Sequence, residues 1–341
     1  MSQSPSELMT RAVEAITAAS HVVASLVDEL DRIRTITKDD RSPVTVADYA
    51  VQAVVGLMLR DTGIEDMVGE EDAARLREDE TVRNEVVATV RRALPDATTE
   101  DVISAIEAGN HSGGPSGRFW TLDPIDGTKG FLRGGQFALA LGLIDDGKVV
   151  MGLLGCPHWS VVEDPSGASV RPPGSICAAL RGEGARAWTT GDDPDSAIEL
   201  HVSKWAEGEA VRTCESVESA HSSHDASARI VQAFPAHEAV RLDSQAKYAV
   251  VASGASDAYL RLPTRPGYIE RIWDHAAGSL VATEAGALVT DMSGAPLDFS
   301  KGRGLEDNRG VICASPEVHA RLIQRIGELG IASTGEANDT P

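Results

Sequence analysis

The chain has 341 residues, of which 42% are hydrophobic and 24% charged, so it can form two ordinary domains or one large layered domain, and wholesale disorder is not expected. Its net charge of −21 argues against nucleic acids and anionic membranes as partners, because the summed field repels polyanions. A small anionic substrate would need bound cations or a local Lys/Arg cluster to offset that field.

Apolar residues at helical spacing predict a long amphipathic helix over residues 6–32. A second helix is expected over 46–60, with Thr45 as its N-cap and Asp48 in its first turn, near the positive end of the helix dipole. Residues 64–72 are expected to form a short strand that runs into an acidic turn. Two more helices are expected, over 81–94 and 99–108.

The segment FWTL at 119–122 has the character of a buried strand, and a DDG turn within 137–156 predicts a hairpin of two apolar strands. The remaining elements expected from the pattern are a hairpin over 176–188 and helices over 225–235, 244–254 and 274–285.

The composition becomes loop-rich after residue 160, which indicates a soft domain boundary between residues 155 and 175. We expect an N-terminal domain over 1–160, a C-terminal domain over 161–330 and a disordered tail over 331–341.

Cysteine usage and the lack of targeting patterns predict a cytoplasmic protein. The four cysteines, Cys156, Cys177, Cys214 and Cys313, are far apart and show no zinc-ligand spacing, so buried thiols in a reducing compartment are expected. The N-terminal stretch lacks the pattern of a secretory signal, and no run approaches the roughly 18 apolar residues of a membrane span.

The stretch Leu122-Asp123-Pro124-Ile125-Asp126-Gly127-Thr128 follows the FWTL strand and carries candidate metal ligands. We expect Pro124, which has no amide donor, to end the strand, so that Asp126 turns back beside Asp123. Two carboxylates so close repel each other unless they share a proton or a cation, and a divalent metal is the usual solution. The Ile125 carbonyl can add a ligand, and Gly127 lets the backbone approach an anion. An Asx-type turn that caps a helix is the alternative.

Three further acidic positions favour the metal interpretation when they are taken together. Glu70 belongs to the cluster Gly69-Glu70-Glu71-Asp72, Asp274 precedes a strongly helical segment, and Asp48 lies at the start of the second expected helix. Taken singly, they also fit a solvated acid, a helix cap and a first-turn aspartate, respectively.

Together, DPIDGTKGF, the upstream GEE and the downstream WDHAAGSLVATEAGA resemble the signature of the inositol monophosphatase superfamily of metal-dependent phosphatases, over about residues 10–315. The resemblance implies an α+β layered sandwich of alternating helical and sheet layers, and hydrolysis of phosphate monoesters with two or three Mg²⁺ ions. Asp48 and Thr128 would orient and deprotonate the attacking water. The metal ligands implied by position are Glu70, Asp123, the Ile125 carbonyl, Asp126 and Asp274.

Longer stretches, such as TKDDRSPVTVADYAVQ and LDSQAKYAVVASGASDAYLRLP, resemble the branch of 3′(2′),5′-bisphosphate nucleotidases, which convert 3′-phosphoadenosine 5′-phosphate to AMP and phosphate. Ser244 and Lys247 lie three apart on the helix expected over 244–254, so their hydroxyl and ammonium groups would share one face. The alternatives are a helix cap for Ser244 and a solvated lysine for Lys247. For His221, which begins the segment HSSHD, the alternative is a set of polar loop residues that cap the next helix. The substrate contacts implied by the resemblance are Gly127, Thr128, His221, Ser244, Lys247 and Arg261.

Two alternative functions fit the same residues. An inositol monophosphatase or inositol polyphosphate 1-phosphatase would share the metal ligands, although such enzymes more often have TTN where this chain has Thr128-Lys129-Gly130. A catalytically silent regulator that binds metal or nucleotide is the non-enzyme alternative. The resemblance also implies inhibition by Li⁺ and, in some members, activity on the sulfated analogue. A monomer or homodimer without nucleic-acid or membrane partners is expected.

Overall fold

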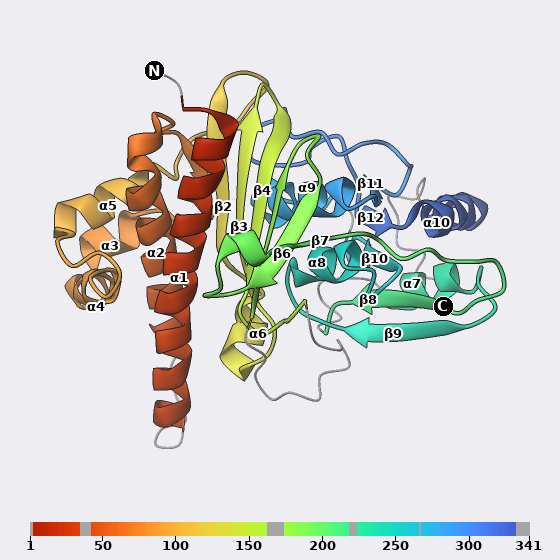
Figure 1. Cartoon of the computed structure of the whole chain (residues 1–341), viewed down its shortest axis with the longest axis horizontal. Coiled ribbons are helices and arrows are strands. Elements are labelled where there is room, and N and C mark those ends of the chain that lie inside the picture. Colours follow the sequence, from red (N-terminus) through yellow and green to blue (C-terminus); the bar gives the residue numbers. More distant parts are fainter. Residues whose placement is uncertain (1–2, 35–41, 162–173, 218–223, 266, 332–341) are drawn as a thin grey trace.

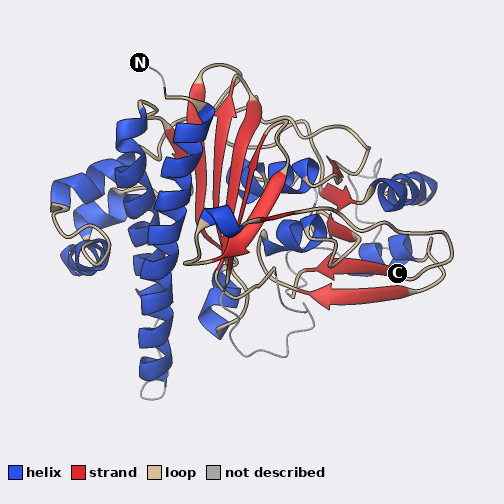
Figure 2. Ribbon diagram, viewed as in Figure 1, coloured by secondary structure: helices blue, strands red, loops and turns tan. Residues whose placement is uncertain are grey.

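Helical and sheet layers alternate across the molecule, which confirms the α+β layered sandwich (Figures 1 and 2). The computed structural model describes residues 3–34, 42–161, 174–217, 224–265 and 267–331. Helices α1 and α2 cover one face of a seven-stranded sheet, and α9 packs on its other face. Helix α8 lies between the two sheets beside α9, and α10 packs against the far side of a five-stranded sheet.

The seven-stranded sheet and its outer helices come from the first part of the chain, and the five-stranded sheet comes from the second. The first part contains α1 (Pro5–Arg34), α2 (Ser42–Leu59), η1 (Arg60–Thr62), β1 (Met67–Gly69), α3 (Ala74–Glu78), α4 (Glu80–Val90), α5 (Thr99–Glu107), β2 (Arg118–Asp126), α6 (Thr128–Arg133), β3 (Ala138–Asp145), β4 (Lys148–Cys156), β5 (Ser175–Leu180), β6 (Ala185–Thr189), η2 (Pro194–Ser196) and β7 (Ile198–Glu199). The second contains β8 (Val211–Glu215), α7 (His224–Val231), β9 (His237–Arg241), α8 (Ala246–Ala252), β10 (Ala258–Arg261), η3 (Ile272–Asp274), α9 (Ala276–Glu284), β11 (Leu288–Thr290), β12 (Val311–Ala314) and α10 (Pro316–Glu328). The strand orders are β1-β2-β3-β4-β5-β6-β7 and β11-β12-β10-β8-β9.

The first helical layer forms as its apolar spacing predicts. Leu8, Ala12, Ile16 and Val23 recur at helical intervals along α1 and are buried in the core that α1 shares with α2 and the sheet. Helix α2 begins at Ser42, so the prediction that Thr45 caps it is wrong: Thr45 lies inside the first turn. The chain enters the helix before the valine-rich apolar face starts, and Pro43 is compatible with a first helical turn.

Strand β2 separates two cores because its side chains alternate. Trp120 and Leu122 are buried on the side of α1 and α2, whereas Phe119 is buried with residues of α9 on the opposite side. Asp123 follows the alternation of Phe119 and Thr121, so it belongs to the α9 side of the sheet.

Helix α9 approaches the seven-stranded sheet closely because two paired glycines face it. Gly142 of β3 pairs with Gly152 of β4 across the ladder. A Cβ atom at residue 152 would lie 2.6 Å from the carbonyl oxygen of Ala277, and one at residue 142 would lie 3.2 Å from Cβ of Ala276. The absence of side chains here therefore sets the distance between the sheet and the start of α9.

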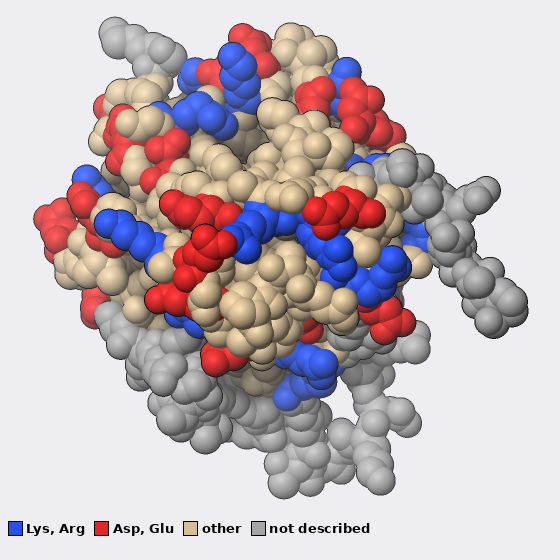
Figure 3. Space-filling model, turned by 90° about the vertical axis from the view of Figure 1, so that its right-hand side faces the viewer, with Lys and Arg blue, Asp and Glu red and all other residues tan. Residues whose placement is uncertain are grey.

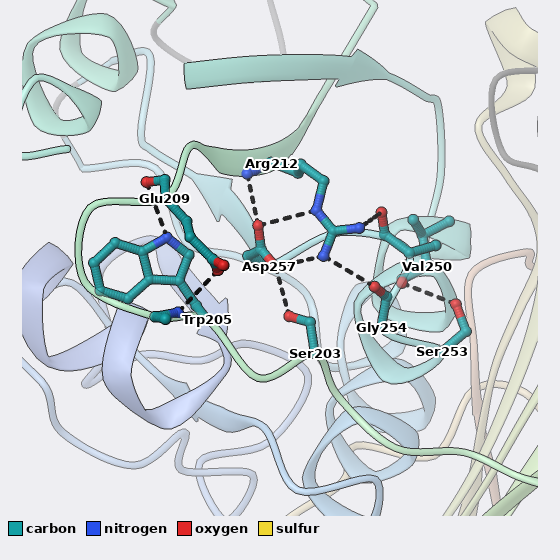
Figure 4. Close-up of polar contacts among 10 residues, drawn as sticks. Ser203, Trp205, Glu209, Arg212, Val250, Ser253, Gly254 and Asp257 are labelled. Atoms are coloured by element: carbon teal, nitrogen blue, oxygen red, sulfur yellow. Dashed lines mark hydrogen bonds and ion pairs between the residues drawn. The ribbon is translucent and has the colours of Figure 1, made fainter. Parts of the chain in front are cut away.

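A half-buried ion pair joins two parallel strands of the second sheet (Figure 4). Arg212 of β8 donates from Nη2 to Asp257 Oδ1 at 2.7 Å and from its backbone amide to Asp257 Oδ2 at 2.7 Å. Ser203 Oγ donates to the same carboxylate at 2.5 Å, and Arg212 also donates to the carbonyls of Ala255 and Gly254. Asp257 directly precedes β10, so this network fixes the starts of β8 and β10 together.

Most expected elements are present, with shifted ends. The strand at 119–122, both hairpins and all the expected helices are confirmed, although α7 and α8 are shorter than predicted. Strands β8 to β12 and helix α10 were not predicted. The proposed boundary near residue 160 stays a prediction, and β5 to β7 continue the first sheet beyond it. Of the tail, residues 332–341 lie outside the described part.

The described helices include none that is long and apolar enough to cross a membrane. On the face shown in Figure 3, acidic and basic side chains of the described residues are interspersed, and they form no continuous basic surface there. The expectation that nucleic acid is not a partner stays a prediction.

Candidate active site

A β-bulge brings Asp123 and Asp126 together at the end of β2. Asp123 pairs with Ala140 of β3 and Asp126 pairs with Ala138, so β2 advances three residues where β3 advances two. Residues three apart on a regular strand point to opposite faces, and the extra residue of the bulge returns both carboxylates to one side. The predicted end of the strand at Pro124 is wrong, because β2 continues to Asp126 and Pro124, which cannot donate to the ladder, lies within the bulge.

A sharp turn follows the bulge and begins α6. Gly127 has a φ of +88°, which favours glycine, and a Cβ atom there would lie 3.0 Å from Cβ of Ser244. Thr128 starts the helix, and its hydroxyl donates to the Ile125 carbonyl at 3.4 Å. The ligand role of the Ile125 carbonyl and the substrate roles of Gly127 and Thr128 stay predictions.

The acidic turn that contains Glu70 lies beside Asp123. Strand β1 runs parallel to β2 with Gly69 opposite Leu122. Glu70 and Asp123, the next residues of the two strands, therefore lie side by side at the carboxyl-terminal end of β1. The Glu70 amide donates to the Leu122 carbonyl at 3.3 Å. Each of the two strands thus places one carboxylate at the end of β1.

Helix α2 fixes this acidic turn through Gln52, a residue that the sequence analysis did not identify. Gln52 is fully buried, accepts from the Glu71 amide at 3.1 Å and donates to the Glu71 carbonyl at 2.8 Å. Asp48 is buried one helical turn before Gln52, so α2 presents it toward the same turn. The four-residue spacing of Asp48 and Gln52 is the sequence signal that could have identified Gln52.

Asp274 adds a carboxylate from the second half of the chain. It ends η3 and makes no capping hydrogen bond to α9, so the interpretation of Asp274 as a helix cap is wrong. Its Oδ2 accepts from Arg261 Nη2 at 3.2 Å. Burial raises the pKa of Asp274 to about 6 against the opposing effect of Arg261, and Asp126 adds to the rise.

The clustered carboxyl groups hold more negative charge than nearby cations balance. Glu70 as a whole residue is exposed, but the protein around its carboxyl group, followed by Asp274 and Glu71, raises its pKa above the usual value. Burial is also the main cause of the raised pKa of Asp123, to which Glu70, Asp126 and Asp274 add, and of Asp48, to which Glu71 and Glu70 add. This mutual effect on the pKa values indicates that the carboxyl groups lie near one another.

This donor set fits a hard divalent cation. Asp123 Oδ1 is buried and has no hydrogen-bond partner among the described residues. Carboxylate oxygens gathered without a balancing charge are the ligands that Mg²⁺ prefers. Among the described residues, the group with three possible ligand atoms within 4.8 Å of one another is Glu270, Asp274 and His275, but Arg261 pairs with Glu270 at 2.7 Å and balances its charge. The site near Glu70, Asp123 and Asp126 is therefore the better candidate.

The turn before α8 joins the carboxylate cluster to the predicted substrate residues. Ser244 has a φ of +70° and precedes α8, which starts at Ala246, so the prediction that Ser244 and Lys247 share one helical face is wrong. The Gln245 amide donates to Asp126 Oδ2 at 2.6 Å. The Gln245 side chain donates to the Trp273 carbonyl at 2.8 Å and accepts from the Gly278 amide at 3.3 Å. Gln245 therefore contacts both halves of the site, a role that no short motif reveals.

Lys247 is buried, so the alternative of a solvated lysine is wrong. Its Nζ donates to the Leu242 carbonyl at 3.2 Å and lies 5.2 Å from the centre of the Tyr259 ring. Burial lowers the pKa of Lys247 to about 8, and Asp126 opposes this shift. The ammonium is therefore still mostly protonated at neutral pH, beside the carboxylate cluster.

Arg261 is held beneath the site by Glu270 and Asp274. It pairs with Glu270, which also lies 3.2 Å from His275 Nε2, and His275 Nδ1 lies 2.8 Å from the Tyr248 hydroxyl. Glu270, which lies four residues before Asp274, was not predicted from the sequence. The predicted nucleotide contact of Arg261 stays a prediction, and His221 lies outside the described residues.

Comparisons with known proteins agree with this fold. The sequence model of the inositol monophosphatase family matches residues 6–330. A protein of Oryza sativa named 3′(2′),5′-bisphosphate nucleotidase is 41% identical over 339 residues, which cover 93% of each chain. A protein of Schizosaccharomyces pombe with the same name is 39% identical and covers 92% of this chain and 93% of its own.

The fold is also that of solved structures in this family. The structure of inositol monophosphatase from Anabaena (Nostoc) superposes with a TM-score of 0.59 and 18% identity, over 95% of this chain and 96% of that chain. At this identity the likeness shows the fold alone. The chain belongs to the inositol monophosphatase family. Within this family, the two curated relatives above carry the name of a nucleotide phosphatase.

Proposed function

We propose that this protein hydrolyses the 3′-phosphate of adenosine 3′,5′-bisphosphate, giving AMP and phosphate, with Mg²⁺ as cofactor. The observation that carries the proposal is the 2.6 Å hydrogen bond from the Gln245 amide to Asp126. It places the turn that carries Ser244, and the Lys247 ammonium, against the carboxylate cluster, so one site can hold a metal and a second anionic group. The curated relatives that span almost the whole chain are named for this substrate class.

The residues divide into three groups with different tasks. Mg²⁺, when bound by Glu70, Asp123, Asp126 and Asp274, stabilises charge on the phosphate and lowers the pKa of water. Asp48 and Thr128 would orient the attacking water and accept its proton, as the resemblance implies. Ser244, Lys247, Arg261 and His221 would hold the nucleotide, because a second phosphate needs cationic and hydroxyl donors that the carboxylate cluster lacks.

A substrate panel tests the proposal directly. Phosphate release is measured with Mg²⁺ from adenosine 3′,5′-bisphosphate, from its 5′-phosphosulfate analogue and from inositol 1-phosphate. We expect the highest kcat/KM for the nucleotide bisphosphate and loss of activity in EDTA. Activity confined to inositol 1-phosphate would instead identify an inositol phosphatase, and no activity on any ester would identify a regulator that binds metal or nucleotide.

Several finer properties belong to the same proposal. We expect two or three Mg²⁺ ions per site, because members of this family generally use Mg²⁺ and the carboxylates offer ligands from both halves of the chain. Inhibition by Li⁺, hydrolysis of the sulfated analogue, a cytoplasmic location and a monomeric or homodimeric state are further expectations. Adding Li⁺ to the substrate panel tests the inhibition, and measuring the mass in solution tests the oligomeric state.

A further inference from the structure

Arg303 contacts the backbone directly before the acidic turn that carries Glu70 and in the loop that follows α5. Its Nη2 donates to the Gly69 carbonyl at 2.6 Å, and Gly69 directly precedes Glu70. Its Nη1 donates to the carbonyls of Gly109 at 3.1 Å and His111 at 3.0 Å. One guanidinium thus fixes the end of β1 and the loop that follows α5.

The same residue contacts the turn that carries Asp274. The guanidinium carbon lies 4.9 Å from the centre of the Trp273 ring, and Trp273 directly precedes Asp274. The Arg303 carbonyl accepts from the Ile272 amide at 3.2 Å. The neighbouring residues Arg271 and Gly304 form an antiparallel bridge. Arg303 is therefore held on both sides: its backbone by the Asp274 turn, its side chain by the Glu70 turn.

We propose that Arg303 is a positioning residue that holds the Glu70 and Asp274 turns at the separation required for their carboxylates to share a metal ion. The proposal rests on the metal site of the proposed function. Arg303 makes no ion pair among the described residues, and its three acceptors are carbonyls, so it acts through geometry rather than through charge.

The chemistry of arginine suits this role. A planar guanidinium presents several donors in a rigid fork and stacks on an aromatic face, whereas a lysine ammonium is a flexible point charge. Lysine can reach one or two of the three carbonyls but cannot reproduce the fork over Trp273. Replacing such outer contacts of a metal site commonly lowers metal affinity by about 10-fold to 100-fold.

Direct titration with Mn²⁺, followed by electron paramagnetic resonance on the full chain without substrate, tests the proposal. We expect R303M to bind Mn²⁺ at least about tenfold more weakly than wild type, with R303K between the two. In phosphate-release assays, R303M should need a correspondingly higher Mg²⁺ concentration for half-maximal activity and recover most of its kcat at saturating Mg²⁺. A residue that only stabilised the fold would change the unfolding temperature in EDTA without this shift.

Arg271 provides a matched control. Its guanidinium lies 5.8 Å from the same Trp273 ring, its side chain is exposed, and it donates to no carbonyl among the described residues. R271M removes the same charge and should bind Mn²⁺ like wild type. Wild-type affinity in both R303M and R303K, or an equal loss in R271M, would overturn the proposal, and R303K alone decides if R303M does not fold.

The two proposals fail in different ways. If wild type binds Mn²⁺ no better than D126N does, the metal site itself is wrong, and the role of Arg303 falls with it. If the binding series follows the expected order but adenosine 3′,5′-bisphosphate is not hydrolysed, the positioning role stands and the proposed substrate is wrong.

Discussion

Asp126 is a residue of the carboxylate cluster at which the two halves of the chain contact each other. It follows the bulge of β2, adds to the raised pKa of Asp123 and accepts the Gln245 amide hydrogen bond. An asparagine at this position keeps the size of the side chain and an oxygen that can accept from Gln245. It does not keep the charge that a divalent cation requires.

We therefore expect Asp126→Asn to lower kcat by about a thousandfold or more, because a displaced metal removes both water activation and charge stabilisation. The fold should remain intact, as measured by circular dichroism and the unfolding temperature. Asp66→Asn, an exposed carboxylate before β1, is the control and should retain activity. Near wild-type turnover in the Asp126 variant would contradict the metal role.

Asp257 tests the ion pair of the second sheet independently of the active site. Burial alone would raise the pKa of Asp257, but hydrogen bonds from Arg212 and Ser203 lower it below its usual value. A depressed folded-state pKa means that the carboxylate stabilises the fold at pH values above about 4, the unfolded value, and that this contribution is lost as pH falls through the folded value.

Asp257→Asn should therefore lower the free energy of unfolding by about 1 to 3 kcal/mol near pH 7, at the lower end of buried pairs because Arg212 is 39% exposed. The difference from wild type should shrink below about pH 4, where wild type also loses the charge. Urea unfolding in EDTA at several pH values measures this difference in the free energy of unfolding. The exposed Asp192→Asn should show a small difference at every pH, and a pH-independent loss in Asp257→Asn would refute the electrostatic interpretation.

At the residue scale, short motifs predicted the carboxylates but not the groups that position them. Asp123 and Asp126 stand in one contiguous stretch, so their chemistry is visible in the sequence. Arg303 is separated from its carbonyl acceptors by 192 to 234 residues, and Gln245 contacts Asp126 through a backbone amide. Neither contact leaves a local pattern, because each depends on how the layers pack.

At the scale of elements, the position of α9 depends on Gly142 and Gly152. Gly152→Ala would place a Cβ atom 2.6 Å from the Ala277 carbonyl oxygen, closer than real contacts allow. We expect the free energy of unfolding to fall by about 1 to 3 kcal/mol, because either the helix or the strand must move. Metal affinity should fall as well, since Asp274 immediately precedes this helix.

Gly327→Ala supplies the matched control for that prediction. Gly327 lies in α10 with an ordinary φ, and a Cβ atom there would meet nothing within 4 Å. Alanine should be neutral or stabilising at this site, because it restricts the unfolded chain more than glycine does. Urea unfolding and Mn²⁺ titration compare the two variants. Equal behaviour would show that close packing of α9 on the sheet does not control the site.

Sequence patterns predicted the elements better than their junctions. The apolar periodicities of α1, α2 and the β3–β4 hairpin are strong local signals, and all three form. Pro124 was expected to end its strand and instead lies in a bulge, and Ser244 was expected within a helix and instead lies in the turn before it. Both corrections arise where tertiary contacts around Asp126 determine the backbone.

At the scale of the whole molecule, the family resemblance indicated the layers, whereas periodicity alone did not. Strands β10 to β12 have only three or four residues each, and most of these residues are apolar. The strands therefore show little alternation of apolar and polar positions. The resulting arrangement places Glu70, Asp123 and Asp126 on the first sheet and Asp274 on the segment that leads into α9. A cation bound by all four would therefore connect the two halves of the chain.

Such a connection predicts that the stability of the protein depends on Mg²⁺. A ligand that binds only the folded state stabilises it by about 2.7 kcal/mol at a concentration 100 times its Kd, so Mg²⁺ should raise the unfolding temperature of wild type. In Asp126→Asn the rise should be largely lost. The metal-free unfolding temperature of this variant should equal or exceed that of wild type, because one of the repelling carboxylates has been removed.

Screening must be separated from specific binding, because a chain of net charge −21 also gains stability when salt weakens its self-repulsion. NaCl at matched ionic strength measures that contribution, and it acts almost equally on wild type and Asp126→Asn, which differ by one charge. The excess effect of Mg²⁺ over NaCl in wild type is the part that belongs to the site. If this excess is absent, or equally large in Asp126→Asn, the four carboxylates do not bind a cation together, and repulsion among them must be relieved by protons instead.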